Sequence, residues 1–179
     1  RGGGELGAVD VGTGSGAIAL SLAKEGPFGR VVATDISADA LDVARENAER
    51  LGLDEKVEFR QGAGWSALGP GERFDVVVSN PPYIAEAERD ELESEVRDWE
   101  PAAALFAPEE GKAVLAALVA GGVERLVPGG LLALEVGLGQ AQEVAAWIEA
   151  ADEYDDSRII RDLAGRERVV LATRRNLAK

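Results

Sequence analysis

The chain contains no cysteine and no histidine among its 179 residues. Without cysteine it can form neither a disulfide nor a thiolate metal site, so cysteine usage gives no information on the compartment in which it works. Without histidine, imidazole acid–base catalysis and the usual zinc and non-haem iron sites are excluded, and we expect no metal site. Any catalysis must therefore use carboxylates, amides, backbone groups or a reactive cofactor.

Basic residues and long apolar runs are also scarce. The 19 lysines and arginines are outnumbered by 33 acidic residues, which gives a net charge of −14. Nucleic-acid-binding proteins usually carry a basic face, so we expect no direct nucleic-acid binding and attribute the charge to solubility. The most apolar windows, residues 115–123 and 131–136, are far shorter than a bilayer-spanning helix. We therefore expect a cytoplasmic protein with no membrane segment.

The overall composition of the chain is that of an ordinary globular domain. Apolar residues make up 46% of the chain and charged residues 29%, and the length suits one domain with a sizeable core. The first residues, Arg1 to Glu5, include neither an initiating Met nor the apolar stretch of a signal peptide. We expect residues 1–179 to be one domain of a longer polypeptide.

Short β-rich runs alternate with helical patterns over the whole chain. This alternation predicts a mostly parallel sheet with helices on both faces. The expected strands are residues 8–11, 30–35, 57–61, 74–79, 131–136, 157–161 and 168–173, and the expected helices are residues 16–24, 38–51, 111–126 and 140–150.

Turn and cap residues place several boundaries. Ser37 and Gly52 are suited to begin and end the second helix. The run Pro128-Gly129-Gly130 is expected to stop the third helix and to lead into the strand at 131–136. The short link at 162–166 predicts a terminal hairpin, and hence an antiparallel strand at one edge of the sheet. Residues 85–107 are acidic and are expected to form a helix followed by a loop.

A glycine-rich segment, residues 10–16 (Asp-Val-Gly-Thr-Gly-Ser-Gly), follows the first strand and opens the first helix. Its glycines let backbone and ligand approach closely, and the helix N-terminus offers free N–H groups. Asp35, at the end of the second strand, is suited to accept hydrogen bonds from a ribose diol. The segment and Asp35 together predict a cradle for a small ligand.

Two cofactors compete for this cradle. Residues 12–17 also satisfy the looser Gly-x-Gly-x-x-Gly/Ala fingerprint of nicotinamide cofactors, so the glycines alone do not discriminate. The Asp10 carboxylate would repel a pyrophosphate but would favour a ligand with an ammonium and a sulfonium, which indicates S-adenosylmethionine. Trp65, after the third strand, has two interpretations: stacking near the adenine, or packing in the core.

The most distinctive run, Asn80-Pro81-Pro82-Tyr83, directly follows the expected strand 74–79. It places a polar amide, two rigid prolines and an aromatic ring at the sheet edge where ligands of open α/β folds bind. The Asn80 side-chain oxygen and the Pro81 carbonyl could each accept one N–H of a planar amide and aim its nitrogen at a methyl group. Tyr83 would pack on the amide plane. The run predicts chemistry on a planar amide or amine, and the cradle would supply the methyl donor.

These motifs together resemble the catalytic domain of the HemK/PrmC family, the S-adenosylmethionine-dependent methyltransferases of glutamine in peptide chain release factors. The resemblance covers nearly the whole chain, although Asn-Pro-Pro-Tyr alone is shared with adenine and other amino-group methyltransferases. The matching residues, in family order, are residues 10–16, Asp35, residues 80–83, Glu100-Pro101, Ala104-Leu105, residues 134–137, Gln140 and residues 165–170.

The resemblance implies a class I S-adenosylmethionine-dependent methyltransferase fold, which is Rossmann-like, with a seven-stranded mostly parallel sheet and one antiparallel strand. It implies S-adenosyl-L-methionine as methyl donor, S-adenosyl-L-homocysteine as product and, as protein partner, a release factor with a Gly-Gly-Gln motif. It also implies an N-terminal helical docking domain outside residues 1–179, and we expect a monomer. The implied catalytic residues are Asn80, Pro81, Pro82 and Tyr83, and the implied cofactor-binding residues are Asp10, Gly12, Thr13, Gly14, Gly16, Asp35, Ile36, Trp65 and Asn80.

The match has departures, and other functions stay open. Ala63 and Gly64 stand where the family usually has an acidic residue that contacts the adenine amino group, so this contact is lost or passes to the backbone. Glu135 and Gln140 match the pattern without an evident chemical role. One alternative is amino-group methylation of a flipped nucleic-acid base, which the lack of a basic patch disfavours. Another is a cofactor-binding module that is inactive without its partner domain.

Overall fold

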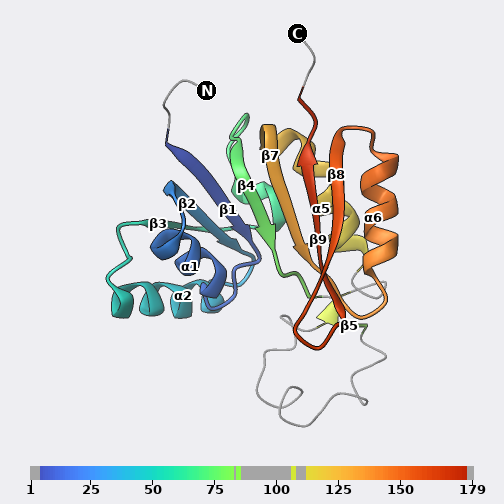
Figure 1. Cartoon of the computed structure of the whole chain (residues 1–179). Helices are drawn as coiled ribbons and strands as arrows, with labels where there is room; N and C mark the ends of the chain where they lie inside the picture. Colours follow the sequence, from blue (N-terminus) through green and yellow to red (C-terminus); the bar gives the residue numbers. More distant parts are fainter. Residues whose placement is uncertain (1–4, 83, 86–105, 108–111, 177–179) are drawn as a thin grey trace.

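The computed structural model describes residues 5–82, 84–85, 106–107 and 112–176 (Figure 1). In chain order the elements are β1 (Leu6–Val11), α1 (Ala17–Glu25), β2 (Phe28–Asp35), α2 (Ala38–Leu51), β3 (Val57–Gln61), the 3₁₀ helix η1 (Gly64–Ala67), β4 (Phe74–Ser79), β5 (Ile84–Ala85), β6 (Phe106–Ala107), α5 (Lys112–Arg125), β7 (Leu126–Glu135), α6 (Ala141–Ala150), β8 (Tyr154–Arg161) and β9 (Glu167–Arg174).

A seven-stranded sheet organises the fold, with the strand order β3-β2-β1-β4-β7-β9-β8. The pairings among β3, β2, β1, β4 and β7 are parallel, whereas β9 is antiparallel to both β7 and β8. The predicted fold class and its one antiparallel strand are therefore confirmed.

The expected position of the antiparallel strand was wrong. The edge strand is β8, and β9 lies one position further in. β9 contributes the fully buried Val170 and Ala172 to the core, and its inner position gives both of its backbone edges a hydrogen-bonding partner, β7 and β8. In contrast, β8 exposes most of its charged residues, which is how proteins protect a sheet edge from pairing with another chain.

The helices cover both faces of the sheet, as predicted. On one face, α1 packs with Ala8, Val31 and Ala33 of β1 and β2, and Ala48 of α2 joins the same cluster. On the other face, α5 and α6 pack on a larger cluster that includes Leu132, Leu134 and Val170. Figure 1 shows α1 and α2 beside the β1–β3 half and α5 and α6 beside the β7–β9–β8 half. Because alternate strand residues point to opposite faces, β1 contributes to both cores.

The helix caps follow the sequence closely. The Ser37 hydroxyl accepts a hydrogen bond from the Ala40 N–H at 3.2 Å, and Gly52 ends α2 with a φ of 66°. Both are common helix-terminus arrangements. The bounds of α2, β3 and β4 agree with the expected ranges residue for residue.

The prediction that the run Pro128-Gly129-Gly130 stops the third helix was wrong. α5 ends at Arg125, and β7 already begins at Leu126 and passes through this run. The pairing with β4 advances from Phe74↔Leu126 to Val76↔Leu131, so the extra residues bulge out of β7. The buried Leu126 side chain holds the start of the strand in the core, and the glycines accommodate the bulge.

Part of the expected helix and loop at residues 85–107 lies outside the described residues. At its two ends, Ile84–Ala85 and Phe106–Ala107 form the parallel pair β5–β6. Among the described residues, no helix is long and apolar enough to cross a membrane.

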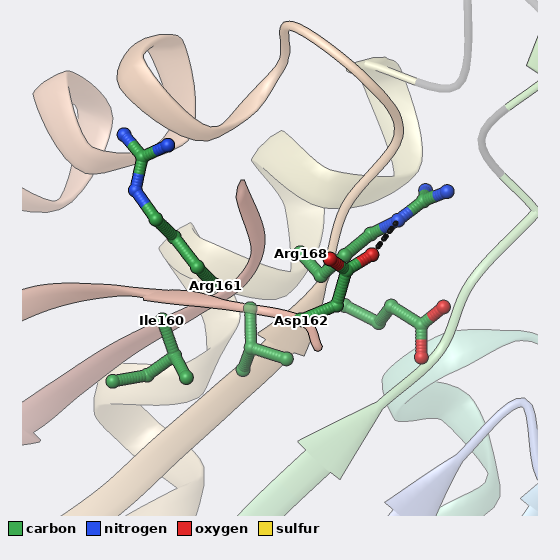
Figure 2. Close-up of a pocket in the computed structure, with 6 residues that line it drawn as sticks. Ile160, Arg161, Asp162 and Arg168 are labelled. Atoms are coloured by element: carbon green, nitrogen blue, oxygen red, sulfur yellow. Dashed lines mark ion pairs between the residues drawn. The ribbon is translucent and has the colours of Figure 1, made fainter. Parts of the chain in front are cut away.

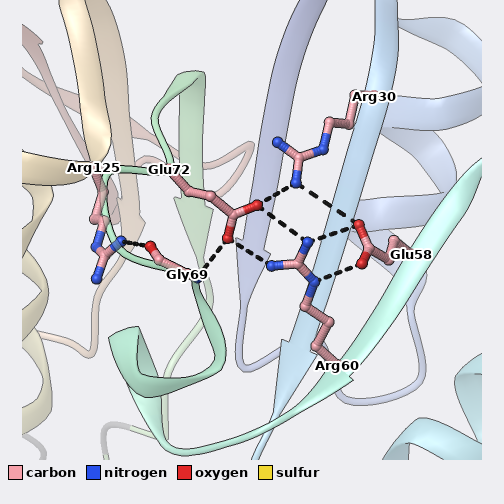
Figure 3. A network of polar contacts seen from close by, with 6 residues as sticks. All are labelled: Arg30, Glu58, Arg60, Gly69, Glu72 and Arg125. Carbon is pink, nitrogen blue, oxygen red and sulfur yellow. Dashed lines mark hydrogen bonds and ion pairs between the residues drawn. The ribbon is translucent and has the colours of Figure 1, made fainter.

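A network of charged side chains connects β2 and β3 to the loop before β4 (Figure 3). Arg60 pairs with Glu58 at 2.8 Å and with Glu72 at 2.7 Å, and Arg30 also pairs with Glu72. Glu72 accepts the Gly69 N–H at 2.6 Å, and the Gly69 carbonyl in turn accepts from Arg125. These contacts, led by the Arg60 hydrogen bond, lower the pKa of Glu72 to about 2.

We predict that Glu72→Gln lowers the free energy of unfolding at pH 7 by about 1 to 2 kcal/mol, after allowance for solvent screening. Because the folded-state pKa of Glu72 is depressed, its contribution is complete above about pH 4.5 and is lost as the pH falls towards 2. Denaturant titrations at pH 7 and pH 3 should show a smaller difference between variant and wild type at pH 3. Glu46→Gln, which removes an exposed ion pair with Arg50, is the control. An equal difference at both pH values would contradict this role.

Candidate functional site

The glycine-rich loop is anchored to the end of β2. The N–H groups of Gly12 and Thr13 both donate to the Thr34 carbonyl, at 2.8 and 2.9 Å, and the Gly16 N–H donates to the Thr13 carbonyl at 2.9 Å. The Asn47 side chain of α2 donates to the Ser15 carbonyl at 3.0 Å. The loop is therefore held in one conformation by β2 and α2 as well as by its own turn.

Glycine occupies the three predicted positions of the loop for different structural reasons. Gly12, Gly14 and Gly16 all have positive φ angles, of 74°, 56° and 84°. A Cβ at Gly16 would lie 3.1 Å from the Ala44 Cβ, so this glycine lets α1 approach α2. A Cβ at Gly12 or Gly14 would meet no described atom within 4 Å, so these two positions border open space. A ligand can approach the backbone there.

Asp10 is almost fully buried beneath the loop, with 1% of its surface exposed. Its Oδ2 atom accepts hydrogen bonds from the Thr13 hydroxyl at 2.6 Å and from the Ala19 N–H of α1 at 3.1 Å. Its Oδ1 atom has no hydrogen-bond partner among the described residues, and neither has the buried hydroxyl of Thr34. Burial, assisted by the nearby Asp35 charge, raises the pKa of Asp10 to about 6.

Asp35 connects the loop to the start of α2. Its Oδ2 atom accepts the Gly14 N–H and its Oδ1 atom accepts the Ser37 N–H, both at 2.9 Å. A carboxylate oxygen can accept more than one hydrogen bond, so this geometry leaves acceptor capacity for a ligand. Ile36, the next residue, has 67% of its surface exposed at the same sheet edge. The structure thus brings Asp10, the glycine loop, Asp35 and Ile36 together.

The Asn-Pro-Pro run lies beside this loop. β1 and β4 pair in parallel up to Asp10↔Val78, and the Ser79 hydroxyl then donates to the Val11 carbonyl at 2.6 Å. Asn80 therefore leaves the sheet next to Gly12, one strand away. Its side chain is exposed and makes no hydrogen bond to other described residues, whereas Pro81 is buried. Pro82 is half-buried, and Tyr83 lies outside the described residues.

Trp65 packs against α5. Its indole N–H donates to the Ala117 carbonyl at 3.0 Å, and a Cβ at Gly121 would lie only 2.1 Å from the indole nitrogen. The ring also contacts the larger core cluster. These contacts match the core-packing interpretation, and the adenine contact stays a prediction.

Several positioning residues were not found from the sequence. Thr34 accepts the loop N–H groups, Ser79 connects β4 to β1, and Asn47 holds Ser15 from 32 residues away along the chain. No spacing pattern signals such long-range contacts. Gln140, matched without a role, is buried, and its Oε1 atom accepts the Gly137 N–H at 2.9 Å, so it fixes the turn after β7.

A cavity of about 400 Å³ lies further along the same sheet edge, beyond β7 (Figure 2). Within it, Arg168 approaches Asp162, with 3.6 Å between Nε and Oδ2. The lining residues are Glu135, Ile160, Arg161, Asp162, Arg168 and Val169.

Comparison with known proteins places this edge in context. A family model described as "Methyltransferase small domain" matches residues 5–96. The release factor glutamine methyltransferase of Bacteroides thetaiotaomicron is 44% identical over 93% of this chain and 59% of its own length. That of Moorella thermoacetica is 47% identical over 93% of this chain and 58% of its own length. These identities confirm the resemblance drawn from the motifs, and the chain spans less than two thirds of these relatives.

Solved structures confirm the fold. A methyltransferase from Pyrococcus furiosus aligns with a TM-score of 0.71 at 23% identity, covering 98% of this chain and 77% of that one. An RNA methyltransferase from Salinibacter ruber, in complex with S-adenosyl-L-homocysteine, aligns with a TM-score of 0.60 at 21% identity, covering 97% of this chain and 83% of that one. At these identities the likeness shows a methyltransferase fold alone.

We predict that Asp10→Asn changes how the stability of the ligand-free protein depends on pH. Because the folded-state pKa of Asp10 is raised, the folded protein binds this proton more tightly, and the Asp10 contribution falls as the pH rises from about 4 to 6. The stability of the variant relative to wild type should therefore increase over this range, by on the order of 2 to 3 kcal/mol. Denaturant titrations of both proteins at several pH values test this. Parallel pH profiles would contradict it.

Proposed function

Because the chain belongs to the methyltransferase small domain family, we propose that it transfers a methyl group from S-adenosyl-L-methionine to the side-chain amide nitrogen of a glutamine in a peptide chain release factor. The observation that carries the proposal is the position of Asn80 beside Gly12, which follows from the pairing of β4 with β1. A methyl donor in the glycine-loop cradle and an amide on Asn80 would meet at one sheet edge. The curated relatives support glutamine as the acceptor.

The residues around the loop fit the methyl donor. Open space borders Gly12 and Gly14. Two buried oxygens on the strands that lead to this loop and to Asp35, Asp10 Oδ1 and Thr34 Oγ1, have no hydrogen-bond partner among the described residues. Asp10 supplies negative charge, which suits a ligand with an ammonium and a sulfonium and opposes a pyrophosphate. Asp35 would bind the ribose hydroxyls. When bound, S-adenosyl-L-methionine supplies an electrophilic methyl group on its sulfonium sulfur.

Asn80 and Pro81 would orient the amide that accepts the methyl group. An amide nitrogen is a poor nucleophile because its lone pair is delocalised into the carbonyl, so holding it in line with the methyl group matters more than deprotonating it. The Asn80 side-chain oxygen and the Pro81 carbonyl would each accept one N–H, which also stabilises positive charge developing on nitrogen. In the reaction the amide nitrogen would gain the methyl group as the sulfur–carbon bond of the donor breaks, and one N–H proton would pass to water. S-adenosyl-L-homocysteine is the other product.

In this proposal residues 1–179 act as the catalytic domain, as a monomer in the cytoplasm. The helical docking domain that the resemblance implies would come from sequence outside these residues. Pro81 and Pro82 would keep the loop rigid, and Tyr83 would pack on the acceptor amide.

We predict that Asn80→Ala suppresses methyl transfer by at least about 100-fold, in the range seen when one orienting hydrogen-bond partner is removed. Binding of S-adenosyl-L-methionine should change less than twofold, because Asn80 is assigned chiefly to the amide that accepts the methyl group. Transfer of labelled methyl to release factor and calorimetry measure the two effects. Asn176→Ala is the matched control, since Asn176 is an exposed asparagine after β9, at the opposite sheet edge. Unchanged turnover in Asn80→Ala would reject the assignment.

We predict that Asp35→Ala weakens binding of S-adenosyl-L-methionine by about 1 to 3 kcal/mol, because it removes charge-assisted hydrogen bonds to the ribose. It also removes the acceptor for the Gly14 and Ser37 N–H groups, so the loop loses part of its support. Calorimetric titration measures the affinity, and Asp54→Ala, an exposed acid beyond the far end of α2, is the control. Equal affinities in Asp35→Ala and wild type would exclude the ribose contact.

A further inference from the structure

The cavity beyond β7 begins one strand away from Asn80. Strand pairing aligns Ser79 with Leu134, so the following residues, Asn80 and Glu135, are level across β4 and β7. Glu135 in turn pairs with Val169, and Val169 pairs with Ile160 on β8. Glu135, Val169 and Ile160 all line the cavity. A single row of residues therefore leads from the proposed acceptor site into the cavity.

The cavity has the size of a small ligand subsite. Its volume of about 400 Å³ falls within the range of ligand pockets, about 300–1,000 Å³. Ile160, with 44% of its surface exposed, provides an apolar wall together with Val169. Figure 2 shows the Asp162 carboxylate and the Arg168 side chain facing each other, while Arg161 points away from this pair.

The residues that line the cavity carry no surplus of positive charge. Two acids, Glu135 and Asp162, are matched by two arginines, Arg161 and Arg168. Arg168 is engaged by Asp162, and Arg161 pairs with Glu167 at 2.7 Å. A phosphodiester would require a surplus of positive charge here, since phosphate contacts dominate nucleic-acid binding. The balanced, partly apolar lining suits an uncharged peptide segment instead.

The β8–β9 hairpin presents an apolar side chain at the rim of the cavity. Leu163, directly after Asp162, is fully exposed. The Oδ1 atom of Asp162 accepts the N–H groups of Ala164 and Arg166, both at 2.9 Å, and its carbonyl accepts the Gly165 N–H at 2.9 Å. These bonds hold the tight loop in one conformation, so Leu163 is exposed on an ordered loop. Leu163 therefore adds a fixed apolar surface directly next to Asp162, which lines the cavity.

We propose that this cavity, with Leu163 at its rim, binds the uncharged peptide segment next to the target glutamine of the protein substrate. The inference rests on the proposed function, because it takes the acceptor at Asn80 to be a glutamine in a polypeptide. The subsite would bind the flanking backbone while Asn80 and Pro81 orient the side chain.

The test places a carboxylate in the cavity or at its rim, using Ile160→Glu and Leu163→Asp in the 179-residue chain. Two readouts are measured: methylation of full-length release factor, and anisotropy of a fluorescent peptide carrying the target glutamine, with S-adenosyl-L-homocysteine present. Ile160→Glu should raise the KM for release factor about tenfold or more and weaken peptide binding to a similar degree. Leu163→Asp should also raise the KM for full-length release factor. The affinity for S-adenosyl-L-methionine and the unfolding midpoint should stay within error of wild type in both.

Val43→Glu is the matched control, because Val43 is a β-branched residue with 48% exposure on α2, away from this edge. It should leave both readouts unchanged. If wild type methylates glutamine and both cavity variants behave like wild type, the subsite is rejected while the proposed function stands.

The remaining outcomes separate the two proposals. If wild type methylates nothing but binds the peptide, and Ile160→Glu abolishes that binding, the subsite is supported and the proposed function fails. Wild type that neither methylates nor binds the peptide overturns both. If a single-stranded oligonucleotide displaces the peptide from wild type and Ile160→Glu also loses the oligonucleotide, the assignment to peptide is wrong.

Discussion

The parallel pairing of β1 with β4, extended by the hydrogen bond from the Ser79 hydroxyl to the Val11 carbonyl, is the constraint on which the site depends. It makes two segments that are 68 residues apart in the chain leave the sheet at the same level. The glycine loop follows β1, and the Asn-Pro-Pro run follows β4. Were this pairing shifted by one residue, every side chain of β4 would change face and Asn80 would point elsewhere.

The rest of the carboxyl edge extends from that junction. On one side, β2 contributes two residues that bind the backbone of the glycine loop: the Thr34 carbonyl accepts the Gly12 and Thr13 N–H groups, and the Asp35 carboxylate accepts the Gly14 N–H. On the other side, the pairing of β7 with β4 brings Glu135 level with Asn80 and leads to the cavity under the β8–β9 hairpin. In our proposals the edge therefore has three consecutive binding sites, for the methyl donor, for the amide that accepts the methyl group and for the flanking peptide. None of them needs histidine or a metal, because the reaction depends on orientation.

Features set by local chemistry were predictable from the sequence, and features set by long-range contacts were not. Strand and helix alternation, the Ser37 cap and the glycine loop follow from propensity and turn chemistry, and the structure agrees with them. The Pro128-Gly129-Gly130 run has the composition of a turn but forms a bulge, because burial of Leu126 begins the strand earlier. The inner position of β9 depends on its pairing with a strand on each side. The hydrogen bond from Asn47 to Ser15 joins residues that are far apart in the sequence. Such contacts have no sequence period.

The most direct test of the account is mass spectrometry of release factor incubated with the chain and S-adenosyl-L-methionine carrying a deuterated methyl group. The account predicts one labelled methyl on the side-chain amide nitrogen of a single glutamine, and no label when Asn80→Ala replaces wild type. Label on another residue type, or on nucleic acid supplied in the same reaction and not on glutamine, would contradict it.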